Sequence, residues 1–292
     1  MSDIDNDTLN ISQKNIEKIS RIKKIKAIMP VHFAGYPCDI QKIRKNNINQ
    51  IIIEDAAHAL GAKYSDGSRV GSCKYSDATV FSFHPVKPIT AGEGGVVTTN
   101  SFTLYKKLLR LRSHGINKLD DSFENKKYAF TKGKLNPWFY EMKELGYHYR
   151  ITDIQCSLAI SQMKKLDKFI NRRKKIAGIY RKKFNNINNI SLAHKQDFNV
   201  SGHHLFILRF DFKNMSINKV DLMNELKKIK IGTQVHYIPI SIHPFYKKIL
   251  RGNTNIKNAM QYYEECLSIP LFYDLSINEQ NYVVENIIRL AK

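Results

Sequence analysis

The chain has 292 residues, of which 42% are hydrophobic, so it can bury a sizeable core and is not a disordered polypeptide. It carries 47 Lys and Arg residues against 26 Asp and Glu residues, which gives a formal net charge of +21. A balance this basic is compatible with nucleic acid, an anionic membrane surface or phosphorylated substrates. The lysines are scattered along the whole chain, however, and form no basic stripe interleaved with aromatic residues. We therefore expect no nucleic-acid partner.

The four cysteines lie far apart and form no C-x-x-C pair, so the sequence suggests neither a zinc ribbon nor a redox motif. Free thiols in a reducing compartment are the simplest interpretation. The opening residues MSDIDNDTLN are polar and acidic, unlike a signal peptide, and no apolar run is long enough to span a bilayer. We expect a cytoplasmic protein without a membrane partner and without a metal site.

Short apolar segments in the first half predict strands that alternate with helical stretches. The predicted strands are Lys26–Phe33, Gln50–Glu54, Ala78–Phe83 and Gly95–Thr99. Continuous apolar strands of this kind suit a sheet that is covered on both faces. Helical segments between some of them favour an α/β architecture.

A long helix is predicted to begin at Thr152 or Asp153, either of which can cap it. Apolar residues follow at close to helical spacing: Ile154, Leu158, Met163, Leu166 and Ile170. The helix runs into the basic stretch Arg172–Lys175, which we interpret as a solvated helix face and not as a binding site.

A smaller α/β unit is predicted after this helix. Its strands are His204–Phe212 and Thr233–Ile238, and Val220–Lys230 between them has apolar residues on one side of a helix. Ser276 and Glu279 form an S-x-x-E capping box before a final helix.

Polar residues follow two of the predicted strands directly. Asp55 and His58 come after the first, and Ser82 and Lys87 come at the end of the second. In an open α/β sheet, ligands collect outside the carboxyl ends of the strands, so parallel neighbours would bring these four residues to one crevice. Such a set suits pyridoxal phosphate (PLP), which needs a lysine amine for a Schiff base, a carboxylate against the pyridine nitrogen and donors for its phosphate.

Each of these residues also has an ordinary structural explanation. A lysine after a strand is usually a solvated surface residue, and an aspartate there is usually a turn or helix cap. A single histidine is more often a satisfied structural residue than a ligand. Spacing alone therefore leaves both the cofactor site and these structural roles open.

Longer motifs carry a resemblance to a known family. The stretches EDAAHALGAKYSDGSRVGS, YSDATVFSFHPVKPITAGEGGVVTTN, LRSHGI, LGYHYRITDIQCSLAISQMKKLDKFINRRKKIA and TQVHYIPI resemble the DegT/DnrJ/EryC1/StrS family of sugar aminotransferases. Within that family, VHFAGYPCDI, NPWFYEMKELGYHYRITDIQ and VHYIPISIHPFY look most like the branch that makes pseudaminic acid.

The resemblance implies a type I PLP-dependent aminotransferase fold that forms a homodimer with active sites at the subunit interface. We expect residues 1–175 to form the PLP-binding large domain and residues 176–292 to form the small C-terminal domain. SDIDNDTLNIS resembles a segment well inside the large domain of the family, so that domain would be truncated at its N-terminus. Apolar strand faces would then be exposed, and cofactor binding by this chain alone would be weak or absent.

By position, Lys87 matches the Schiff-base lysine of the family, Asp55 the pyridinium partner, His58 the residue beside the ring and Ser82 a phosphate ligand. Lys87 would also separate the chain from related sugar dehydratases, which carry histidine at that position. The implied reaction takes an amino group from L-glutamate and places it on the C4 ketone of a UDP-linked 4-keto-6-deoxy-N-acetylhexosamine. Lys87 would move the proton between cofactor and substrate carbon.

Two further positions come from the resemblance. His148 stands where the family motif G-Y-N-Y-R has an asparagine that reaches the cofactor phosphate of the neighbouring subunit, and histidine can still donate a hydrogen bond. His236 matches a motif near the nucleotide-sugar site.

One alternative from another class is a truncated, catalytically inactive remnant of the family that acts only as an interaction partner. A basic nucleic-acid binder is the other, and a salt-dependent shift of DNA mobility would support it.

Overall fold

The computed structural model describes residues 1–118, 123–250 and 256–291. Helices in these ranges are α1 Gln13–Ser20, α2 Ile40–Asn46, α3 Phe102–Arg112, α4 Lys126–Ala129, α5 Asp153–Met163, α6 Leu166–Lys183, α7 Lys219–Lys228, α8 Pro244–Leu250, α9 Lys257–Glu265 and α10 Ile277–Leu290, with short 3-10 turns η1 Phe33–Gly35, η2 Phe198–Val200 and η3 Ile240–Ile242. Strands are β1 Ala27–Ile28, β2 Ile51–Asp55, β3 Ala78–Ser82, β4 Gly95–Thr98, β5 Ile116–Asn117, β6 Phe130–Thr131, β7 Lys134–Leu135, β8 Glu141–Met142, β9 Ile190–Leu192, β10 Phe206–Phe210 and β11 Cys266–Ile269.

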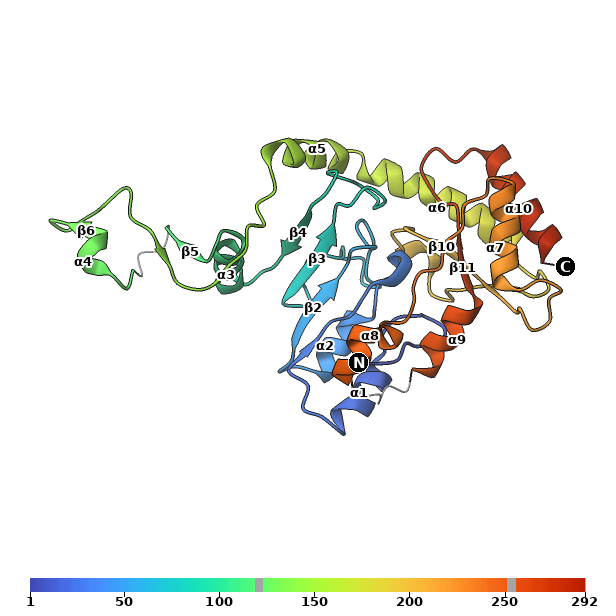
Figure 1. Cartoon of the computed structure of the whole chain (residues 1–292), viewed down its shortest axis with the longest axis horizontal. Helices are drawn as coiled ribbons and strands as arrows, with labels where there is room; N and C mark the ends of the chain where they lie inside the picture. Colours follow the sequence, from blue (N-terminus) through green and yellow to red (C-terminus); the bar gives the residue numbers. More distant parts are fainter. Residues whose placement is uncertain (119–122, 251–255, 292) are drawn as a thin grey trace.

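The main sheet has the strand order β1-β2-β3-β4 (Figure 1). Strands β1, β2 and β3 are parallel to their neighbours, and β4 is antiparallel to β3. The expected α/β architecture with a mostly parallel sheet is therefore confirmed. The carboxyl ends of β2 and β3 lie at the same edge of the sheet, which is where an α/β protein usually binds its ligand.

The first predicted strand, Lys26–Phe33, is much shorter in the structure. Only Ala27 and Ile28 pair with β2, and Val31 pairs with Asp55 as an isolated bridge. Pro30 separates the two because it has no N–H to offer the ladder, although its carbonyl accepts a hydrogen bond from the backbone of Asp55 at 2.9 Å. The chain thus leaves the regular sheet early at this edge.

Side chains alternate between the two faces of the sheet. Ile52 and Glu54 are fully buried in the face that packs with α1 and α2. Ile51, Val80 and Val97 belong to the opposite face and are exposed. Within the described part of the chain only one face is covered, so the prediction of a sheet covered on both faces is wrong here, and the expected exposure of an apolar strand face is confirmed.

The predicted long helix is two helices, α5 and α6, which are separated at Lys164 and Lys165. Thr152 forms a capping box with Gln155, which confirms it as the cap. Three of the apolar residues expected at the core, Ile154, Leu158 and Met163, are exposed in this structure, whereas Leu166 is buried. Helical spacing therefore identified helical structure in this segment, but neither the break at Lys164 and Lys165 nor what α5 packs against.

The interpretation of Arg172–Lys175 as a solvated face is wrong for its first two residues. Arg172 donates to the carbonyls of Tyr273 and Leu275, at 3.2 and 2.6 Å. Arg173 is buried and donates to three backbone carbonyls, those of His203, His204 and Leu271, at 3.4, 3.2 and 3.0 Å. Loop carbonyls without a strand partner need such donors, and a guanidinium can serve several of them.

A second, smaller unit follows. Its sheet has the antiparallel order β11-β10-β9 and packs with α6, α7 and α10 (Figure 1). The predicted Ser276 and Glu279 capping box at the start of α10 is confirmed. Thr233–Ile238 is not a strand, since only Gln234 forms an isolated bridge, to Ser268.

The core of the first unit includes Leu166 near the start of α6, and the core of the second begins with Ile176 on the same helix. Helix α6 therefore contributes to both cores. The division of the chain into residues 1–175 and 176–292 stays a prediction.

An extended arm carries β5 to β8 and α4 away from the body of the molecule (Figure 1). It presents exposed aromatic side chains that include Trp138, Tyr147 and Tyr149. Among the described residues, no helix combines the length and the apolar character that crossing a bilayer requires.

Candidate active site

Asp55 and Ser82 lie on the open face of the sheet, at the carboxyl ends of two neighbouring parallel strands. Asp55 pairs with Val80 in register, and Ser82 is two residues further along the same strand, so all three side chains share one face. The Asp55 carboxylate accepts a hydrogen bond from the backbone N–H of Ala57 at 3.0 Å, which orients it at the strand end.

Lys87 follows β3 in a tight turn, in which its backbone N–H donates to the carbonyl of His84 at 3.0 Å. Burial lowers the pKa of the Lys87 amine, and the negative charge of Asp55 opposes that effect. The two side chains therefore interact electrostatically, and the ammonium of Lys87 is partly desolvated. A lysine with a lowered pKa has a larger neutral fraction, which is the form that acts as nucleophile or base.

His58 is buried beside this lysine. Burial lowers the pKa of His58 to about 3, and the positive charges of Lys87 and His236 act in the same direction. The imidazole is therefore neutral near pH 7. Its Nε2 atom lies 3.3 Å from the hydroxyl of Tyr237, and its Nδ1 atom has no hydrogen-bond partner within the ranges that the structure describes.

His236 approaches the same site from the loop after α7. Its Nδ1 atom lies 2.7 Å from the hydroxyl of Ser268 on β11. Burial and the charge of Lys87 lower its pKa as well. The structure thus brings His236 close to Lys87 from the smaller unit, although the two residues are far apart in sequence.

His148 lies elsewhere. It forms an isolated bridge with Ser113, its Nε2 atom is 2.9 Å from a guanidinium nitrogen of Arg150, and its ring packs 5.0 Å from that of His114. These contacts belong to the start of the extended arm. Among the described residues of one chain, His148 has no contact with Lys87, so the structure does not bring it into the cluster.

Two residues of the cluster were not predicted from the sequence. Tyr237 pairs with His58, and both burial and Asp55 raise the pKa of its hydroxyl. His204 is buried with its ring centroid 4.4 Å from that of His58. The adjacency of Tyr237 to His236 was a usable signal, whereas the buried position of His204 is decided by long-range packing.

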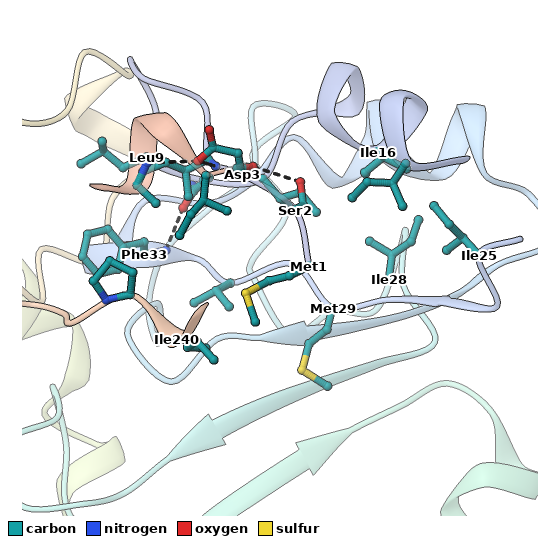
Figure 2. A pocket seen from close by; sticks show the side chains of 18 of the residues that line it. Met1, Ser2, Asp3, Leu9, Ile16, Ile25, Ile28, Met29, Phe33 and Ile240 are labelled. Atoms are coloured by element: carbon teal, nitrogen blue, oxygen red, sulfur yellow. Dashed lines mark hydrogen bonds between the residues drawn. The ribbon is translucent and has the colours of Figure 1, made fainter. Parts of the chain in front are cut away.

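An apolar pocket of about 520 Å³ lies apart from these polar residues (Figure 2). Its lining includes Met1, Ile16, Ile28, Phe33 and Ile240 and does not include Lys87, Asp55, His58 or His236. The described lining contains no lysine for a Schiff base, and the carboxylate of Asp3, which also lines it, accepts hydrogen bonds from the backbone N–H groups of Asn258 and Ala259. The polar cluster is therefore the better candidate for a PLP site.

The residues on the open face fit PLP. Lys87 provides an amine, Asp55 provides a carboxylate within its electrostatic reach, and Ser82 provides a hydroxyl on the same sheet face. These are the groups that the aldehyde, the pyridine nitrogen and the phosphate of PLP require. Among the described residues, no group of three or more His, Cys, Asp or Glu side chains could hold a metal ion. An α/β fold with this set of groups defines the class of PLP-dependent enzymes.

Comparison with known proteins identifies the family. Residues 1–288 match the DegT/DnrJ/EryC1/StrS aminotransferase family. An uncharacterised protein of Methanocaldococcus jannaschii is 40% identical over 273 residues, which cover 92% of this chain and 68% of that protein. The UDP-4-amino-4,6-dideoxy-N-acetyl-beta-L-altrosamine transaminase of Campylobacter jejuni is 37% identical over 296 residues, which cover 99% of this chain and 72% of that enzyme. The chain therefore belongs to the DegT/DnrJ/EryC1/StrS aminotransferase family.

Solved structures agree with this assignment. PseC of Helicobacter pylori, an aminotransferase involved in the biosynthesis of pseudaminic acid, superposes with a TM-score of 0.86 at 29% identity, over 99% of this chain and 72% of that chain. Structures of a Streptococcus pneumoniae relative, also 29% identical, have TM-scores of 0.82 and 0.83, cover 100% of this chain and 75% and 74% of theirs, and include PMP and PLP forms. The protein is a PLP-dependent sugar aminotransferase by family.

Proposed function

We propose that the protein transfers an amino group from L-glutamate to the C4 ketone of a UDP-linked 4-keto-6-deoxy-N-acetylhexosamine, in nucleotide-sugar biosynthesis of the pseudaminic acid type. The similarity to the altrosamine transaminase and to PseC supports the choice of substrate. The observation that carries the proposal is the position of Asp55 and Ser82 on one sheet face at the carboxyl ends of parallel strands, with the half-buried Lys87 in the turn that follows β3.

PLP, when bound, supplies an electron sink that stabilises negative charge on the reacting carbon. Lys87 would hold the cofactor covalently through Nζ and, as a base, move a proton to and from the reacting carbon of glutamate and of the sugar. Burial favours the neutral amine that this role needs. Asp55 would keep a proton on the pyridine nitrogen, since a carboxylate at this position stabilises the pyridinium.

The remaining residues would bind and orient. The neutral imidazole of His58 would lie against the pyridine ring without adding charge to it, which its low pKa of about 3 supports. Ser82 would donate a hydrogen bond to the phosphate from the same sheet face as Asp55. His236, held by Ser268, would contact the nucleotide sugar. Each full cycle would convert glutamate into 2-oxoglutarate and the ketone into an amine.

We also propose that two copies of the chain form a homodimer in which His148 of one copy serves the active site of the other. The placement of His148 at the base of the arm, away from Lys87 of its own chain, supports this arrangement. So do the exposed Trp138 and Tyr149, since large exposed aromatic residues are typical of interfaces. Sedimentation of the purified protein tests it, and a monomer at micromolar concentration would contradict it.

The glutamate half-reaction tests the proposed activity. Purified protein is incubated with excess PLP and L-glutamate, and 2-oxoglutarate is measured before and after addition of a UDP-4-keto sugar. Because cofactor binding by this chain alone is expected to be weak, we expect product that depends on enzyme and rises with the PLP concentration, and none above background in Lys87→Ala. Lys63→Ala, which removes an exposed lysine, is the matched control and should keep the activity. A folded protein that forms no 2-oxoglutarate would favour the inactive remnant that acts only as an interaction partner.

A further inference from the structure

The imidazole of His58 is held by few hydrogen bonds. Its Nε2 atom has one long contact, 3.3 Å to the hydroxyl of Tyr237, and its Nδ1 atom has none within the described chain. One contact of this length does not fix the orientation of a ring. Something else must keep His58 in place beside Lys87.

The ring of His204 lies directly against it. The two ring centroids are 4.4 Å apart and the planes are tilted by 43°. His204 is only 5% exposed, so its ring forms a wall of the compartment that contains His58. The ring of Phe33 also lies 6.1 Å from that of His58, and the ring of Tyr237 stacks on it at the same centroid distance. Ring packing at these distances contributes orientation as well as burial.

His204 itself is held firmly by the backbone. Its N–H donates to the carbonyl of Ala34 at 3.1 Å, and its carbonyl accepts from the guanidinium of Arg173 at 3.2 Å. Arg173 is buried in α6 and binds the carbonyls of His203 and Leu271 as well. The segment that enters the smaller sheet is therefore fixed to helix α6 just where it packs on His58.

Gly35 shows how closely these segments meet. Its φ is +102°, and a Cβ atom at this position would lie 2.9 and 3.0 Å from the backbone nitrogens of His203 and His204, and 3.1 Å from the carbonyl oxygen of His58. No other residue type combines this conformation with so little space. The loop that carries His58 and the segment that carries His204 are therefore held together by close backbone packing around Gly35, and not by mobile side chains alone.

We propose that His204 is a positioning residue, which fixes the imidazole of His58 beside Lys87, and that Arg173 couples this position to helix α6. This inference rests on the proposed function, because it assigns His58 to the cofactor ring. His204 touches neither cofactor nor substrate in this scheme. It acts by filling the space behind His58, so the shape of its ring matters and its ability to titrate does not.

The protein without cofactor provides the first test. NMR follows the protonation of His58, assigned with His58→Gln, in the unmodified protein and in His204→Ala. Burial is the largest cause of the low His58 pKa, so water admitted behind the ring should raise that pKa toward its usual value, and the imidazole should take up a proton between pH 6 and pH 5, where the unmodified protein keeps it neutral. His204→Phe should keep the low value. His203→Ala should keep it too, because His203 is equally buried but packs on Phe198, 4.5 Å away.

An unchanged His58 titration in folded His204→Ala would overturn the proposal. If His204→Ala does not fold, His204→Asn replaces it in the test, because asparagine also removes the ring but keeps a polar side chain. A His203→Ala variant that shifts His58 as much as His204→Ala would also overturn it, since the effect would then be a general loosening of the segment.

Titration with PLP provides the second test. We expect His204→Ala to raise the dissociation constant of PLP about tenfold, the upper end of what an aromatic pair contributes, and His204→Phe and His203→Ala to stay within about twofold. Equal losses in all three variants would contradict a positioning role. If the unmodified protein binds no PLP, the proposed function fails, while the titration of His58 still decides whether His204 positions it.

Discussion

Glu54 and Asp55 are neighbours on β2, and their side chains lie on opposite faces of the same sheet. Glu54 is fully buried, whereas Asp55 is partly exposed at the open face. Two carboxylates one residue apart therefore occupy different environments. The comparison separates a polar group that stabilises the fold from one that is available for chemistry.

Glu54 has hydrogen-bond partners on every side. Nε2 of His32 lies 2.6 Å from Oε2 of the Glu54 carboxylate. The hydroxyl of Thr79 donates a hydrogen bond to the same carboxylate at 3.0 Å, and the hydroxyls of Tyr64 and Ser76 also donate to it. Nδ1 of His32 accepts the backbone N–H of Cys38, so Nε2 carries the proton that it donates to Glu54. Burial alone would raise the pKa of Glu54, but the hydrogen bonds, led by that from His32, lower it.

The cluster around Lys87 is built in the opposite way. His58 and His204 are buried with Nδ1 atoms that lack hydrogen-bond partners in the described chain, and Lys87 is partly desolvated. Native proteins usually satisfy buried polar groups, and the exceptions concentrate at functional sites. The complete set of partners around Glu54 therefore indicates a structural role, whereas the partly desolvated amine of Lys87 is available for chemistry.

Removing Glu54 should have the largest effect on stability. Glu54→Ala leaves several buried donors without their acceptor, so we expect the free energy of unfolding to fall by about 4 kcal/mol. Asp55→Ala, one residue away, should change it by less than about 1 kcal/mol. Urea unfolding monitored by circular dichroism measures both. Equal losses in the two variants would remove the proposed distinction between the faces.

Asp55→Asn should act on catalysis instead. The amide cannot hold a proton on the pyridine nitrogen, so we expect the glutamate half-reaction to slow by roughly a hundredfold, with the unfolding transition nearly unchanged. Single-turnover formation of 2-oxoglutarate measures the rate. Asp66→Asn, which alters an exposed carboxylate paired with Lys74, is the control and should keep the rate. A fully active Asp55→Asn would contradict the assigned role.

The pH dependence of stability should show a smaller effect. Burial lowers the pKa of His58 to about 3 and those of His194 and His203 to about 4. Their pKa values in the unfolded chain are higher, near 6.5, so the unfolded state takes up protons first as the pH falls. The stabilisation that these neutral histidines provide is therefore fully present above about pH 6.5 and is lost below it. For the three histidines together, the free energy of unfolding should fall by about 2 kcal/mol between pH 7 and pH 6.

Urea unfolding at the two pH values measures this change. A free energy of unfolding that is equal at pH 7 and pH 6 would show that the buried histidines are not held neutral by the fold.

The sequence predicted the parts of the site that depend on local order along the chain. An apolar strand that ends in Asp55, and a second that leads to Lys87, were enough to place both residues at one edge of a parallel sheet. In the structure the charge of Asp55 raises the pKa of the Lys87 amine, against the lowering effect of burial. The capping box at Ser276 was equally local and was predicted at the correct residues, and Thr152 was one of the two caps expected for α5.

The parts that were missed depend on contacts between distant segments. Arg173 looked like one more residue of a basic stretch, because a sequence with many lysines does not distinguish a buried guanidinium from a solvated one. His204 becomes part of the site only through packing on a loop that lies far away in sequence. The run Thr233–Ile238 is apolar enough for a strand, but the only pairing among its described residues is the bridge of Gln234 to Ser268.

The most direct measurement asks which lysine PLP binds. The protein is treated with excess PLP, reduced with borohydride and digested, and the modified peptides are identified by mass spectrometry. We predict that the label lies on the peptide that contains Lys87, is lost in Lys87→Arg and persists in Lys63→Ala. A label spread evenly over surface lysines, or one of full strength in Lys87→Arg, would contradict the assignment of this site.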